Sequence, residues 1–116
     1  MKRNFEVYLQ DILESIELIR GYMKDCPSLE VFQEDMGRQD AVMYRLSIIG
    51  EAAKRLPKQM RDENPQVPWK SISGTRDIII HDYDNVNYKM VWDIVHTDLD
   101  ALELQIKMIV GKGRQF

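Results

Sequence analysis

The chain has 116 residues, 44% hydrophobic and 30% charged, which are the proportions of an ordinary globular protein, and we expect one domain over residues 1–116. Its formal net charge of −3 argues against a protein that coats nucleic acid through many phosphate contacts, although a local phosphate site is compatible with it. A single cysteine, Cys26, excludes an internal disulfide, and with no signal-like start and no apolar run near the roughly 20 residues of a membrane span it predicts a cytoplasmic protein.

The N-terminal third predicts one long helix followed by a short one. From Phe5 to Lys24, apolar residues recur every three or four positions, which is typical of a helix with one buried stripe, and Asn4 is suited to cap it. Cys26-Pro27 ends this helix, because the residue before proline avoids the helical region. Ser28 is then suited to cap a short helix that runs to Gln33.

A second long helix is predicted from Asp40 to Leu56. Gly37 is expected to mark the break before it, and Pro57 the end. The run Asp62-Glu63-Asn64-Pro65 then closes a short helix or turn.

The C-terminal half predicts two further helices. Pro68 is suited to the first turn of a helix that reaches the three isoleucines at 78–80, and the polar run 82–85 is typical of a turn. Asn87 is placed to cap a last long helix to about Val110, with Gly111 and Gly113 at its end. No alternating strand pattern is present, so the sequence predicts an all-α fold, an antiparallel up-and-down bundle of four to five main helices.

The most informative segment of the chain runs from Arg76 to Tyr83. Arg76 offers a planar set of donors suited to phosphate, and His81 carries a group that can move protons near neutral pH. The other histidine, His96, is expected at the surface. Together these residues favour a site that acts on a phosphodiester, since cleaving RNA without a metal needs a base, an acid and a cation that stabilises the phosphorane.

Helical geometry restricts how Arg76 and His81 can cooperate. Five positions along a helix place two side chains roughly 140° apart, so either the helix stops near His81 or groups from two subunits meet in one cleft. The three isoleucines cannot all face one core, which favours a second apolar surface such as a dimer interface. A symmetric dimer would also supply two histidines and two arginines.

The segment Arg-x4-His-x-Tyr resembles the motif of HepT-like toxins within the HEPN superfamily of ribonucleases. Further stretches resemble that family in the same order along nearly the whole chain: Gln39-Asp40-Ala41-Val42, Ile49-Gly50-Glu51-Ala52-Ala53-Lys54, Val67-Pro68-Trp69 and Gly74-Thr75-Arg76. The resemblance implies a homodimeric, metal-independent endoribonuclease without a cofactor, which is encoded beside an antitoxin of the minimal nucleotidyltransferase type.

Carried over residue by residue, the resemblance places Arg76 and His81 on the catalytic pair. Tyr83 falls on the tyrosine that the antitoxin modifies with AMP, and Asp77 on the polar position after the arginine, which is often asparagine. Glu51 is placed either to orient Arg76 or only to pair with a neighbouring cation.

Simpler structural interpretations remain open for these features. Arg76 could form only a surface ion pair, His81 could cap a helix end, and Tyr83 could be a rim residue. A basic cluster could guide RNA or only keep one face solvated; its members are Lys54, Arg55, Lys58 and Arg61. The two tryptophans, Trp69 and Trp92, suit packing better than base stacking. No metal-ligand spacing is present. The alternative functions are a non-catalytic, substrate-binding partner of a nucleotidyltransferase and a dimerising scaffold.

Overall fold

The computed structural model describes residues 5–113, and every regular element in that range is helical, which confirms the all-α prediction. The long elements are α1 (Phe5–Met23), α3 (Met36–Arg55), α5 (Trp69–His81), and a continuous run of α6 (Tyr88–Asp93), η2 (Ile94–Asp98) and α7 (Leu99–Gly113). The short elements are α2 (Leu29–Gln33), α4 (Lys58–Asp62) and the 3-10 turn η1 (Tyr83–Asn85).

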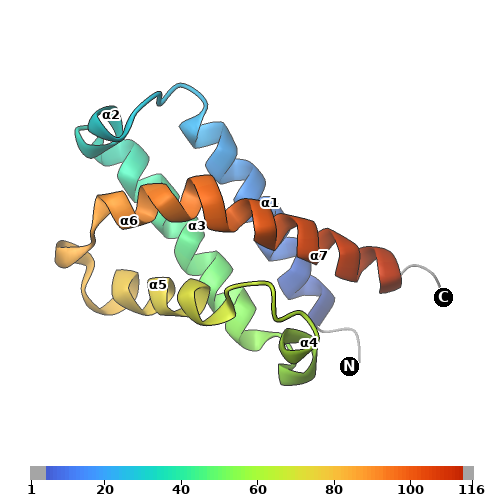
Figure 1. Cartoon of the computed structure of the whole chain (residues 1–116). Helices are drawn as coiled ribbons and strands as arrows, with labels where there is room; N and C mark the ends of the chain where they lie inside the picture. The colour runs from blue at the N-terminus through green and yellow to red at the C-terminus, as the bar shows by residue number, and fades with distance from the viewer. Residues whose placement is uncertain (1–4, 114–116) are drawn as a thin grey trace.

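Successive long helices run in opposite directions, with α3 at the centre (Figure 1). Helix α3 packs on α1 along one side and on α5 along the other, while α7 crosses α1. The core is aliphatic, with Phe32 from α2 as its largest fully buried side chain. No helix within residues 5–113 is long and apolar enough to cross a membrane.

The first two predicted helices are confirmed. The apolar stripe of α1 is buried at Leu9, Ile12, Ile16 and Ile19, as its spacing predicted. The Ser28 hydroxyl accepts a hydrogen bond from the Val31 amide at 3.3 Å, so it caps α2. The predicted cap Asn4 lies outside the described residues.

The predicted start of the second long helix was wrong. Helix α3 begins at Met36, four residues before the predicted Asp40, and Gly37 lies in its first turn instead of in a break. The cap is Asp35, whose carboxylate accepts a hydrogen bond from the Arg38 amide at 3.0 Å. A glycine ends a helix readily when it adopts positive φ, and no glycine among residues 5–113 does so.

The last long helix differs from its prediction in two places. Asn87 caps it as expected, accepting from the Met90 amide at 3.1 Å. However, Ile94–Asp98 form a π-helical turn, and α7 continues through Gly111 to Gly113. Because Gly111 keeps a helical conformation, it does not end the helix where the sequence suggested.

Candidate active site

The motif lies on α5 and on the turn that follows it. Pro68 precedes the first residue of α5, and His81 is the last residue of the helix, so the predicted helix end near His81 is confirmed. The His81 side chain is exposed, and no hydrogen bond or ion pair within residues 5–113 engages its imidazole. An unengaged imidazole at a helix end is accessible to a ligand from solvent.

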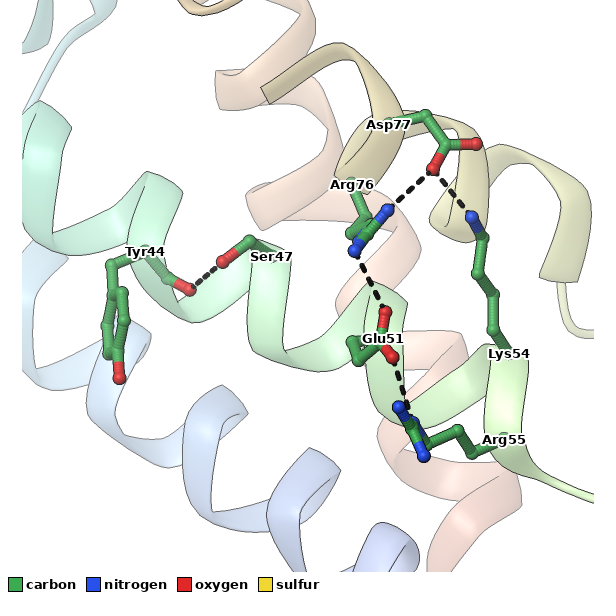
Figure 2. A network of polar contacts seen from close by, with 7 residues as sticks. All are labelled: Tyr44, Ser47, Glu51, Lys54, Arg55, Arg76 and Asp77. Atoms are coloured by element: carbon green, nitrogen blue, oxygen red, sulfur yellow. Dashed lines mark hydrogen bonds and ion pairs between the residues drawn. The ribbon is translucent and has the colours of Figure 1, made fainter. Parts of the chain in front are cut away.

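Arg76 is held between two carboxylates (Figure 2). Its Nη2 lies 3.1 Å from Glu51 Oε1 on α3, and its Nη1 lies 3.2 Å from Asp77 Oδ1. Lys54 also binds Asp77, at 2.6 Å, and Arg55 binds the second oxygen of Glu51, at 2.8 Å. Glu51 therefore both orients Arg76 and pairs with Arg55, so the two roles considered from the sequence occur together.

The network keeps both carboxylates ionised. The hydrogen bond from Arg55, together with the charges of Arg76 and Lys54, holds the pKa of Glu51 below its ordinary value. The hydrogen bonds from Lys54 and Arg76 likewise lower the pKa of Asp77. Arg76 donates a hydrogen bond to Asp77 and forms an ion pair with Glu51, and these two contacts together orient the guanidinium.

The basic cluster anticipated on α3 and α4 is largely neutralised by ion pairs. Lys54 and Arg55 belong to the Arg76 network, and Lys58 pairs with Asp62 at 2.8 Å within α4. For Arg61, no carboxylate within residues 5–113 lies within ion-pair distance. Most of the cluster therefore serves the structure, and Arg61 remains available for a ligand.

The approach of α3 to α5 at this site depends on Gly50. A Cβ atom on Gly50 would lie 2.2 Å from Arg76 Cβ and 3.1 Å from the Ile72 carbonyl oxygen. Any larger residue would push α5 away from α3. Although the segment Ile49-Gly50-Glu51 stood out in the sequence, the reason for its glycine becomes visible only in the packing.

We expect Gly50→Ala to lower the free energy of unfolding by about 1–3 kcal/mol, because the added methyl group overlaps Arg76 and a backbone oxygen that cannot rotate away. The change in free energy is measured by urea denaturation, from the shift of the unfolding midpoint when the slope of free energy against urea concentration is unchanged. Gly21→Ala is the matched control: a Cβ there meets nothing within 4 Å, so helix propensity alone should stabilise the protein by about 0.5–1 kcal/mol. Equal changes in stability at the two sites would show that the close contact of Gly50 with α5 does not restrict the residue at this position.

Tyr83 is fastened to α3 by a hydrogen bond that the sequence did not indicate. Its phenol donates to the Asp40 carboxylate, and this bond, with partial burial, raises the pKa of Tyr83 to about 12. The side chain is nevertheless 43% exposed. Asp40 stood in a segment that resembled the family, but 43 residues separate it from Tyr83, so only the fold could reveal the contact.

The structure does not bring all the predicted site residues into one cluster. Arg76 and His81 both lie within α5, so they project roughly 140° apart within one chain. Ile79 is buried, whereas Ile78 and Ile80 are exposed at 39% and 51%. The expectation that the three isoleucines face different surroundings is therefore confirmed.

The other candidate residues take structural roles. His96 is exposed, as predicted, and its ring lies against Trp92 with centroids 4.0 Å apart, while its Nδ1 is 2.8 Å from the Trp92 carbonyl oxygen. Trp92 also contacts Phe32 in the core. Among residues 5–113, no group of three or more His, Cys, Asp or Glu side chains is placed to hold a metal ion.

Fold and site define an all-helical protein that carries an Arg-x4-His motif at the end of one helix. Residues 12–109 match the family described as Ribonuclease HepT-like. Since this match spans most of the chain, the protein belongs to the HepT-like ribonuclease family, and the resemblance inferred from the sequence is confirmed.

Several curated relatives are similar over most of their length. A protein of Caldanaerobacter subterraneus, provisionally named an RNase, is 41% identical over 107 residues, which are 92% of this chain and 95% of the relative. A provisionally named RNase of Methanocaldococcus jannaschii is 38% identical, over 96% of this chain and 94% of its own. One of Thermococcus cleftensis, provisionally named ribonuclease HepT, is also 38% identical, over 89% and 93%. No solved structure matches the chain.

Proposed function

We propose that this protein is the toxin of a toxin–antitoxin pair, an endoribonuclease that cleaves RNA without a metal and is silenced by AMP transfer to Tyr83. The observation that carries the proposal is that one helix presents both an oriented guanidinium, Arg76, and an unengaged imidazole, His81, in a member of a ribonuclease family. The names of the relatives support the same reaction class.

The reaction we propose is an attack by the ribose 2′-hydroxyl. His81 accepts the hydroxyl proton as the 2′-oxygen forms a bond to the adjacent phosphorus. The bond from phosphorus to the 5′-oxygen breaks, and that oxygen takes a proton from a second imidazole. The products are a 2′,3′-cyclic phosphate and a 5′-hydroxyl. Arg76 stabilises the negative charge that accumulates on the phosphorane.

The second imidazole in this scheme belongs to a second copy of the chain. Within residues 5–113 the other histidine, His96, is engaged with Trp92, and the geometry of α5 separates Arg76 from His81. The exposed Ile78 and Ile80 offer apolar surface for a two-fold contact beside the motif. Light scattering should therefore report a dimer at micromolar concentration, and a strict monomer would contradict the composite site.

Control of the enzyme is proposed to act at Tyr83. A partner nucleotidyltransferase would join the phenol oxygen to the α-phosphorus of ATP, with release of pyrophosphate. The added phosphate carries negative charge and the adenosine is bulky, so both would oppose entry of RNA near His81.

The decisive test is cleavage of cellular RNA by the purified chain in the presence of EDTA. We expect cuts that leave 2′,3′-cyclic phosphate ends, no cleavage of DNA, and no cut at a site whose ribose is replaced by 2′-deoxyribose. Strict dependence on a divalent ion would refute the mechanism. Failure to cut any RNA would favour the alternative function, a non-catalytic partner of a nucleotidyltransferase.

A further inference from the structure

A pocket of about 560 Å³ is lined by residues from the end of α3, from helix α4 and from α5. It is open to solvent, and it shares Lys54 and Asp77 with the ion-pair network of Arg76. The side chains and the glycine that matter for its chemistry are Lys54, Arg61, Trp69, Lys70, Gly74 and Asp77.

The pocket carries unbalanced positive charge. Both of its carboxylates are already paired: Asp77 binds Lys54 and Arg76, and Asp62 binds Lys58. No ion pair among residues 5–113 engages Lys70 or Arg61, and the buried Nε of Arg61 has no hydrogen-bond partner there. Two cations without counter-charges in one concave site favour an anionic ligand.

Trp69 gives the pocket an aromatic wall in a fixed position. Its indole N–H donates to the Asn64 carbonyl oxygen at 2.9 Å, and one side of the ring packs on the core. The sequence indicated only a packing role, yet Trp69 also lines the pocket. An immobilised aromatic ring beside cations is the arrangement that binds an unpaired base and its phosphate.

The pocket and His81 lie on the same side of α5. Lys70, Gly74, Asp77 and His81 are separated by four, three and four residues, which places them on one helical face. The distance from Lys70 to His81 along the helix axis is roughly 16 Å at 1.5 Å per residue. A single strand lying along this face would reach both the pocket and the imidazole.

We propose that this pocket binds one unpaired nucleotide of the RNA substrate, a short distance along the strand from the cleaved bond. Lys70 and Arg61 bind its phosphate, and Trp69 stacks on its base. The inference rests on the proposed function for its ligand, and it makes the substrate single-stranded over the segment that crosses α5, since a paired base cannot reach the ring.

Gly74 provides a direct test. A Cβ at Gly74 meets nothing within 4 Å, so Gly74→Gln should fill the pocket without disturbing the fold. Gly21→Gln is the matched control, since Gly21 is also a helical glycine with nothing within 4 Å, but on α1. Binding of a fluorescent 2′-O-methyl oligoribonucleotide, which cannot be cleaved by 2′-hydroxyl attack, is measured by anisotropy.

We expect Gly74→Gln to weaken binding at least tenfold and Gly21→Gln to leave it unchanged. Lys70→Ala should weaken binding several-fold and reduce the slope of log affinity against log salt by about 1. Equal affinity of Gly74→Gln and the unaltered chain would overturn the proposal. A pocket that binds free AMP while Gly74→Gln leaves RNA affinity unchanged would also overturn the proposal.

Because this assay measures binding alone, its outcome is independent of catalysis. A chain that cleaves RNA but is insensitive to Gly74→Gln keeps the proposed function and loses the pocket. A chain that binds RNA through the pocket but never cleaves keeps the pocket and loses the proposed function. A chain that binds no single-stranded RNA overturns the pocket.

Discussion

His81→Ala is expected to lower the rate of RNA cleavage by about 10²–10⁴-fold, the range found when a general acid or base is removed. His81 is exposed at the end of α5, so the substitution removes little packing, and the thermal midpoint should stay close to that of the unaltered protein. The measurement is the initial rate on RNA in EDTA.

His96→Ala is the matched control, because His96 is the other histidine and is also exposed. It should retain full cleavage activity. If His96→Ala and His81→Ala lose activity equally, general effects on the protein rather than proton transfer at His81 explain the result.

Arg76→Ala extends the same test to the cation. Alanine keeps the Cβ that packs against Gly50, and Glu51 and Asp77 keep Arg55 and Lys54 as partners, so the fold should survive. We expect a loss of about 10²–10³-fold in rate. Arg20→Ala, which removes another arginine between two carboxylates, Asp100 and Glu103, should have no effect on cleavage. Activity that survives in both His81→Ala and Arg76→Ala would exclude the mechanism.

Incubation with the cognate nucleotidyltransferase, ATP and Mg²⁺ is expected to abolish cleavage and to raise the mass of the chain by one or more AMP units. Because the pKa of Tyr83 is raised to about 12, its phenol is protonated at neutral pH and must lose its proton during the transfer. Tyr83→Phe lacks the phenol oxygen, so it should remain unmodified in the presence of the partner. It should also stay an active ribonuclease, since the proposed cleavage step does not use the phenol.

Tyr44→Phe is the matched control for this experiment. Tyr44 is another exposed tyrosine, 59% accessible on α3, and its loss should leave both the mass shift and the silencing intact. Intact-mass spectra that do not change with the partner, or a label that maps to a residue other than Tyr83, would refute the assignment.

The helices were predictable from local patterns, but several of their boundaries were not. The apolar stripe of α1 and the caps Ser28 and Asn87 follow from neighbouring residues, and the structure confirms them. Gly37 and Gly111 were misread because glycine favours a helix end mainly through positive φ, and the identity of the residue does not reveal whether it adopts that conformation. The π turn at Ile94–Asp98 left no recognised signal.

For the candidate site, the sequence supplied the motif but little of its surroundings. Arg76, His81 and Tyr83 could be identified because they lie within eight positions and resemble a known motif. Helix α3 supplies residues that contact Arg76 and Tyr83, and two of these, Gly50 and Asp40, had no assigned role before the packing of α3 against α5 was known. Such contacts depend on tertiary structure. A single sequence does not show which distant residues vary together among relatives, so it does not reveal these contacts.

The hydrogen bond from Tyr83 to Asp40 couples the chemical state of the phenol oxygen to the conformation of the turn that carries it. The hydrogen that Asp40 accepts is the one that any ester of the phenol must lose, so a modified Tyr83 could no longer donate to that carboxylate. An added phosphate would instead set two negative charges against each other between η1 and α3. Modification of this oxygen would thus release η1 from α3. Amide hydrogen exchange in residues 82–87 should then become faster.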